Sequence, residues 1–366
     1  MASTLSAAPS TPSLFLSNIP SGPNPLGKQE YTELYQLVKQ RGLLDKQPRF
    51  YTYKIVSSLG LMAASLAIMA TFGSLWVQLL NAVLMSVAFA QIAYLGHDSG
   101  HQQMFSSLRK NDAMLMAVNF LTGLDRSWWI DKHHRHHRRP NDATFDLDIN
   151  LPFFAFTDGQ ATGKSGLLRF VVKYQAFFLF PLMLFEGFSL RTDSTSYLLR
   201  RKNIKYMALE LFAVVAHLTA YCAIVFYLLD PWVAVSFLIV HHVVWGVYMA
   251  TVFAPNHKGM PIIDDGRRLD FLRQQVVTAR SIKGGRLTEF YYGGLNYQIE
   301  HHLFPTMSRN QLKNVRPIVQ EFCAAHSIPY HETGVIRSWK EILASLHYTS
   351  GALRGKRPQQ TTTPEA

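Results

Sequence analysis

Residues 55–95, IVSSLGLMAASLAIMATFGSLWVQLLNAVLMSVAFAQIAYL, contain no Asp, Glu, Lys or Arg. A bilayer core of about 30 Å is crossed by about 20 apolar residues of helix, so this stretch is long enough for two spans with a turn near 71–74. Residues 211–229 and 231–253 are equally free of these charged side chains. The sequence therefore predicts an all-α integral membrane fold with four transmembrane helices in two hairpins.

The basic residues support this arrangement. All 36 Lys and Arg lie in 1–54, 97–205 and 254–366, and none lies at the expected hairpin tips, 71–74 and 230–231. The positive-inside rule then places both termini and both long loops in the cytosol, at a bacterial inner membrane or at the endoplasmic reticulum. The net charge of +12 is explained by basic loops beside anionic lipid headgroups, and no motif indicates a nucleic-acid partner.

The spans are spread through the chain, so one membrane domain is predicted over 31–348. The flanking segments 1–30 and 349–366 are rich in Ser, Pro and Thr and are predicted to be disordered tails. Two further hydrophobic stretches do not meet the requirements of a span. Residues 113–124 are short enough for a buried or re-entrant helix, and 167–190 carry charges among aromatics, as an interfacial helix does.

Histidines indicate the function. Spacings of i, i+3 and i+4 place side chains on one helix face, so each histidine cluster can present its nitrogens to a common point. One tetrahedral site needs at most four protein ligands, so eight histidines predict two metal ions in a cytosolic helical cap. The eight candidates are His97, His101, His133, His136, His137, His257, His301 and His302. With four spans, all eight lie on the same side of the membrane.

The motifs HDSGH (97–101), WWIDKHHRHHRRPN (128–141), FAPNHKGM (253–260) and GGLNYQIEHHLFP (293–305) resemble, in order and spacing, the histidine boxes of the membrane fatty acid desaturases. The QIEHH form is similar to bacterial acyl-CoA or acyl-lipid desaturases and to front-end desaturases. The resemblance implies two iron ions that use O2 as co-substrate to remove two hydrogens from an acyl chain, leaving a cis double bond. The spacing of imidazoles does not by itself select iron.

The neighbours of the boxes are candidate ligands or orienting groups. Within HHRHH, His134 is also spaced i, i+3 from His137, and the family pattern selects His133, His136 and His137. The resemblance carries over His257 as an additional ligand. Gln298 stands where the strict box has His; it is expected to bind a metal weakly, to act through water, or to orient His301 or His302. Further candidates for metal-bound water or for orienting imidazoles are Asn256, Asp98, Asp131, Asp146 and Asp148, and His134 is expected either to orient a neighbour or to face the substrate.

The expected partners are a long-chain acyl substrate, the bilayer and a separate electron donor. We find no haem motif of a fused cytochrome b5 and no nucleotide fingerprint, so no bound haem or nucleotide is predicted. A ferredoxin, or cytochrome b5 with its reductase, is expected to dock on the basic surface. The alternative function is a hydroxylase or ketolase with the same boxes. A metal transporter is disfavoured because the eight histidines gather at one face rather than along a path through the membrane.

Overall fold

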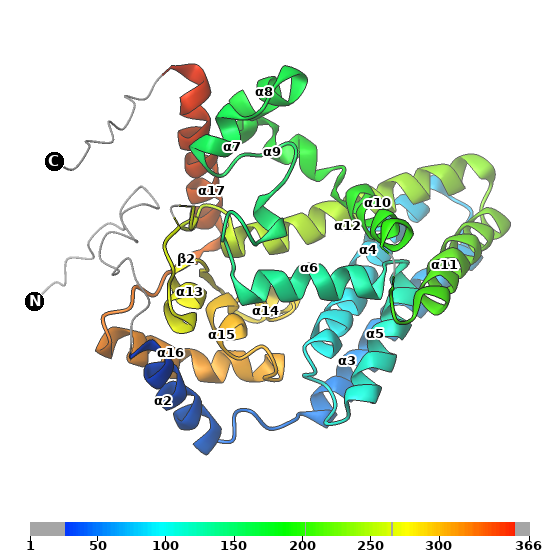
Figure 1. The fold of residues 1–366 in the computed structure, drawn as a ribbon. Coiled ribbons are helices and arrows are strands. Elements are labelled where there is room, and N and C mark those ends of the chain that lie inside the picture. The colour runs from blue at the N-terminus through cyan, green and yellow to red at the C-terminus, as the bar shows by residue number, and fades with distance from the viewer. Residues whose placement is uncertain (1–25, 202, 265, 356–366) are drawn as a thin grey trace, which may run out of the picture.

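The computed structural model describes residues 26–201, 203–264 and 266–355 and is mostly helical (Figure 1). Four helices are long and apolar enough to cross a membrane: α3 Pro48–Thr71, α4 Leu75–Gly100, α11 Met207–Leu228 and α12 Pro231–His257. Pro48 and Pro231 lie in the first turns of α3 and α12, where a missing N–H costs nothing. The predicted four-span helical membrane fold is confirmed.

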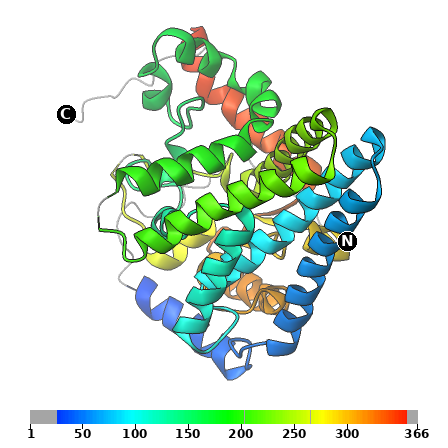
Figure 2. The same cartoon turned by 90° about the vertical axis from the view of Figure 1, so that its right-hand side faces the viewer.

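The packing of the spans is centred on α4. Both α3 and α12 pack along it, whereas α11 packs more on α5 (Leu108–Thr122) than on its hairpin partner α12. Figure 2 shows these helices running alongside one another. Two serines form hydrogen bonds between spans: Ser65 donates to Asn81 Oδ1 at 2.7 Å, and Ser86 donates to the His241 carbonyl at 3.0 Å. Such bonds hold helices together where lipid offers no partner for a polar group.

Shorter helices form a cap at the ends of α4 and α12 (Figure 1). The apolar core of this cap is formed by α2 Gly27–Gln40, α13 Phe271–Val277, α15 Gln298–Leu303 and α16 Leu312–Ala325. Because α4 and α12 end at Gly100 and His257, the spans deliver their last residues directly into this cap. The cap helices are α2 Gly27–Gln40, α6 Arg126–Arg138, α7 Asp158–Thr162, α13 Phe271–Val277, α14 Arg286–Tyr291, α15 Gln298–Leu303, α16 Leu312–Ala325, α17 Val335–Thr349, η1 Leu147–Ile149, η2 Arg309–Gln311 and η3 Ser350–Arg354.

Two details refine the prediction. A short sheet accompanies the helices, in which β1 Ser281–Lys283 pairs in parallel with β2 Glu332–Gly334. The expected tails are also shorter than predicted, since α2 begins at Gly27, inside 1–30, and η3 lies inside 349–366. Residues 1–25 and 356–366 lie outside the described part of the chain, where the prediction of disorder stays a prediction.

The stretch 167–190 is divided among three helices rather than forming one. Helices α8 Gly166–Lys173 and α9 Gln175–Met183 meet at a bend of 101°, and α10 Glu186–Arg200 follows. The bent pair is either a broken span or a re-entrant loop. Large apolar side chains on this segment remain exposed, as in a surface that faces lipid; they include Leu167, Phe170, Phe177, Phe180, Phe185 and Phe188.

Candidate metal centre

The first two histidine boxes lie on helix ends that face each other. His97 occupies the last turn of α4 and His101 is its C-cap residue. Helix α6 begins at Arg126, and the carboxylate of its N-cap residue Asp125 accepts from Trp128 N. About two turns later, α6 presents His133, and His136 and His137 complete the same face. The Trp129 ring stacks on His133 at 4.5 Å between centroids, which holds that imidazole in place.

The remaining histidines come from α12 and α15. His257 is the last residue of α12. Before α15 the chain turns at Gly293 and Gly294, whose φ angles of 59° and 84° favour glycine. A side chain at Gly293 would overlap the Tyr94 ring, so the turn packs directly on α4. Helix α15 then carries His301 and His302 into the space between α4 and α6, where both are buried.

The eight histidine nitrogens form two adjacent groups. In each group every residue offers one nitrogen, and these atoms all lie within 4.8 Å of one another. In the larger group Nε2 atoms approach to 2.8 Å between His101 and His133 and to 3.1 Å between His137 and His301. In the smaller group His257 Nε2 lies 3.1 Å from the Nε2 atoms of its two partners. The groups are His97, His101, His133, His137 and His301, and His136, His257 and His302.

Hydrogen bonds at the Nδ1 atoms, which face away from the cluster, explain why the Nε2 atoms face a common centre. His136 Nδ1 lies 2.9 Å from Asp146 Oδ2, and His302 Nδ1 lies 2.8 Å from Gln275 Oε1. His257 Nδ1 lies 3.1 Å from the Thr278 carbonyl. Each of these oxygens accepts a hydrogen bond, so we infer that Nδ1 carries the proton and Nε2 presents a lone pair. Orientation by an outer oxygen is typical of metal-binding histidines.

These nitrogens suit metal ions better than they suit one another. A neutral imidazole has one donor and one acceptor, so rings whose Nδ1 atoms donate outward cannot satisfy each other's Nε2 lone pairs. His97 Nε2 is buried and has no hydrogen-bond partner. A buried acceptor without a donor is costly, whereas a cation between the converging lone pairs would satisfy them. The donor set therefore fits two metal ions, and imidazole-only coordination is compatible with iron.

The protonation states are consistent with metal binding. Burial, reinforced by neighbouring imidazoles, holds the pKa values of His133 and His137 well below the usual range. The same causes lower the pKa values of His301 and His302. These rings are therefore neutral at physiological pH, the form in which histidine binds metals. His136 differs: burial lowers its pKa, but the Asp146 carboxylate more than offsets this and raises it overall.

The structure shows which of the candidate orienting residues lie beside a histidine of the cluster. Asp98 Oδ1 lies 3.3 Å from His97 Nδ1, and Asp148 Oδ2 lies 3.5 Å from His136 Nδ1. Asp131 instead pairs with Arg135 at 3.0 Å and contacts no imidazole among the contacts found for the described residues. His134 is exposed and belongs to neither nitrogen group, although its ring lies 6.2 Å from that of His101, so its role as an orienting or substrate-facing residue stays a prediction.

Gln298 and Asn256 form a bridge to His257. Gln298 Oε1 accepts from Asn256 Nδ2 at 3.0 Å, and Gln298 Nε2 lies 2.9 Å from His257 Nε2. Gln298 therefore contacts His257 rather than the expected His301 or His302. Asn256 Oδ1 is buried without a partner. Rotating both amides by 180° would give Asn256 Oδ1 a donor and turn Gln298 Oε1 towards the metal-binding nitrogens.

Three groups that orient the imidazoles or their partners could not be recognised in the sequence. Gln275 and the Thr278 carbonyl orient imidazoles from α13 and the turn that follows it, but QQVV and TAR carry no recognisable pattern. Arg309, after the last box, reaches back to Asp98, with Nε and Oδ2 2.9 Å apart. Only the folded chain shows these pairs, because their members are far apart in sequence.

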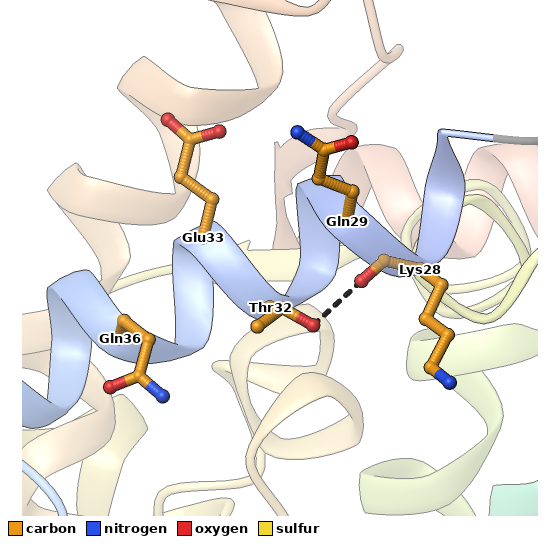
Figure 3. Close-up of a pocket in the computed structure, with 5 residues that line it drawn as sticks. All are labelled: Lys28, Gln29, Thr32, Glu33 and Gln36. Atoms are coloured by element: carbon orange, nitrogen blue, oxygen red, sulfur yellow. Dashed lines mark hydrogen bonds between the residues drawn. The ribbon is translucent and has the colours of Figure 1, made fainter.

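An open hollow on α2 is separate from this centre. Figure 3 shows its five lining side chains, Lys28, Gln29, Thr32, Glu33 and Gln36. It contains none of the eight histidines, and Glu33 is its only acidic lining residue.

Four candidate membrane spans with a buried histidine cluster that could hold two metal ions are typical of a membrane-bound di-metal protein. Residues 74–334 match the family described as fatty acid desaturase. The chain therefore belongs to the fatty acid desaturase family, whose members are oxidoreductases.

Individual relatives agree with this assignment. An acyl-lipid (9-3)-desaturase of Physcomitrium patens is 30% identical over 88% of this chain and 63% of its own length. A Delta(6)-fatty-acid desaturase of Caenorhabditis elegans is 30% identical, over 82% of this chain and 70% of the relative. A Delta(8)-fatty-acid desaturase of Borago officinalis is 29% identical, over 82% and 71%. The chain thus spans less than two thirds of the moss protein. The predicted affinity to bacterial members stays a prediction.

Proposed function

We propose that this chain desaturates a fatty acyl chain carried on CoA or on a lipid, using O2 and two iron ions to introduce a cis double bond. The observation that supports this most is the convergence of eight histidine nitrogens where the ends of α4 and α12 enter the cap. The proposed ligands are His97, His101, His133, His136, His137, His257, His301 and His302. The names of the relatives, which specify fatty acid and acyl-lipid substrates, support the substrate class.

The protein's own part in this reaction is positioning and exclusion of water. Bound iron supplies the redox capacity to use O2, which no side chain has. Asp146, Gln275 and the Thr278 carbonyl fix the imidazoles that would hold it. The burial of His301 and His302 keeps solvent from the centre. An acyl chain rising from the membrane between the ends of α4 and α12 would meet the metals without passing through bulk water.

Expression in a host that lacks the activity tests this proposal. We expect new double bonds at one position in the host's acyl chains, located by mass spectrometry of derivatised lipids. Oxygen-containing products without new double bonds would instead support the alternative, a hydroxylase or ketolase using the same boxes. Brief labelling with an acyl precursor, followed by separation of CoA and lipid pools, shows which carrier holds the first product.

The proposed topology places both termini, the metal centre and the electron donor in the cytosol. The donor is proposed to be a ferredoxin, or cytochrome b5 with its reductase, because the net charge of +12 favours an acidic partner.

Cysteines introduced at Ser74 and Pro231 should react with an impermeant reagent from the non-cytosolic side, since both hairpin turns lack basic residues. A cysteine at exposed Lys313 in the cap is the control and should react only from the cytosol. Reversed labelling of all three sites would contradict this orientation.

Gln298 provides a finer test of the centre. Gln298→Leu should lower desaturation about 5- to 200-fold, because an apolar group leaves Asn256 and His257 without a polar partner, at a cost of roughly 1 to 3 kcal/mol. Gln298→His should retain activity, since imidazole can replace a weak oxygen donor. Product formation and iron content of both variants are the measurements. Wild-type rate and iron content in Gln298→Leu would exclude a metal role for Gln298.

A further inference from the structure

Arg280 lies between α13 and β1 and has no exposed surface. Arginine is almost never fully buried unless it is paired. The backbone N–H of this residue donates to the Asn256 carbonyl at 2.9 Å, its Nε donates to the Pro255 carbonyl, and its Nη2 donates to the Lys258 carbonyl. One residue therefore binds three carbonyls at the end of α12, on both sides of His257.

These bonds complete the C-terminus of α12. A helix leaves its last four carbonyls without partners inside the helix. In α12 the first and the last of the four accept from backbone N–H groups further along the chain, and the second and third accept from Arg280. Burial lowers the pKa of Arg280 to about 10, so the guanidinium stays charged at neutral pH. A cation at this end of a helix is also favoured by the helix dipole.

Glu341 of α17 binds the remaining guanidinium nitrogen. Its Oε2 accepts from Arg280 Nη1 and lies 2.9 Å from His331 Nε2. Helix α17 also approaches the end of α12 directly: at Gly259, whose φ is 80°, a Cβ would lie 3.1 Å from the Glu341 carbonyl oxygen. Arg280 therefore joins the end of α12 to α17, a helix that follows the residues 74–334 matched by the family.

The position of His257 depends on this segment twice. Its backbone lies between the carbonyls that Arg280 binds, and its Nδ1 lies 3.1 Å from the carbonyl of Thr278, two residues before Arg280. Metal sites hold their ligand distances within about 0.2 Å, so a small shift of the helix end would displace Nε2 from the smaller nitrogen group. The larger group comes from α4, α6 and α15 and does not include the end of α12.

We propose that Arg280 is a positioning residue that holds His257 in the smaller nitrogen group, and that Glu341 ties this arginine to α17. The inference rests on the proposed function in one respect, that both nitrogen groups bind metal ions. It goes further because it makes the two ions unequal. Loss of the arginine should weaken the ion in the smaller group and leave the ion in the larger group bound.

Cobalt(II) binding to the metal-free full chain tests this difference, because nitrogen sites bind divalent first-row metals in general and no product has to form. Wild type should bind two ions in equilibrium dialysis. Arg280→Lys keeps a charge opposite Glu341 but lacks the planar fork that reaches the carbonyls. Its second ion should bind about 10- to 100-fold more weakly, as is typical when a group that supports a ligand is lost, and its first ion should keep wild-type affinity.

Arg337→Gln is the matched control. It removes the other arginine that pairs with Glu341, on the exposed side of α17, and should bind both ions as wild type does. Equal affinity for the second ion in wild type and Arg280→Lys would overturn the proposal. An equal loss of both ions would also overturn it, because a general loss of stability affects the two groups alike.

Glu341→Gln keeps the proposal testable if Arg280→Lys does not fold. This variant leaves the carbonyl bonds in place and removes the charge that ties Arg280 to α17, so its second ion should bind more weakly than that of Arg337→Gln. Equal binding in these two variants would contradict the proposal. Wild type that binds both ions but forms no desaturated product would refute the proposed function and leave this inference standing, whereas wild type that binds only one ion would refute both.

Discussion

His301→Ala abolishes desaturation while the protein still inserts into the membrane. The substitution removes one of five nitrogens in the larger group, and no nearby side chain replaces it, because His137 and His97 already face the same centre. Loss of an outer-shell partner alone typically costs 10- to 100-fold, so removal of a ligand should cost more than about 100-fold in product formation. Product yield and iron per chain are measured on the same purified sample.

His134→Ala is the matched control for this experiment. It removes an imidazole from the same run of four histidines, but this ring is exposed and lies outside both nitrogen groups. We therefore expect it to keep most of its activity and all of its iron. If His134→Ala were as inactive as His301→Ala, the assignment of His133, His136 and His137 as the metal-facing side of α6 would be wrong.

Arg309→Gln lowers the free energy of unfolding by about 3 to 5 kcal/mol, because it leaves the Asp98 carboxylate buried without its cation. Asp98 is 1% exposed, Arg309 is 4% exposed, and their side chains are 2.9 Å apart. Arg309 also donates to the Gly293 carbonyl at 3.1 Å, which ties the turn before α15 to the end of α4. The measurement is the unfolding midpoint of the variant in detergent. Its iron content should fall as well, because Asp98 orients His97.

A second substitution shows whether the buried charge is responsible. Asp98→Asn combined with Arg309→Gln replaces the ion pair by two neutral amides and should recover most of the lost stability. Arg337→Gln is the surface control; Arg337 is exposed and Glu341 keeps its pair with Arg280, so about 1 kcal/mol or less is expected. A double variant as unstable as Arg309→Gln alone would show that Arg309 acts through packing rather than through Asp98.

The sequence predicted the parts of the fold that are encoded locally. Four long uncharged stretches and histidines at helical spacing depend on neighbours within a few turns, and the structure confirms the four spans and brings all eight histidines together. The bend at Tyr174 was missed because α8 and α9 are both apolar, and composition does not show where such a stretch changes direction.

Contacts between distant segments could not be predicted from the sequence. Gln275 and His302 meet because α13 packs on α15, and Arg309 meets Asp98 because the last box folds back on α4. The pairing of β1 with β2 has the same origin, since 48 residues lie between Lys283, the end of β1, and Glu332, the start of β2. His134 shows that spacing alone is ambiguous: it also lies i, i+3 from His137, and the structure leaves it outside both nitrogen groups.

The metal content of the purified chain tests the central claim most directly. Protein purified from cells grown with iron, and analysed by inductively coupled plasma mass spectrometry against protein concentration from amino-acid analysis, should contain close to two iron ions per chain. His136→Ala should lower this value, because it removes one of three nitrogens from the smaller group. Two irons per chain in wild type and a loss in the variant are the predicted result; one zinc per chain and no iron would contradict the account.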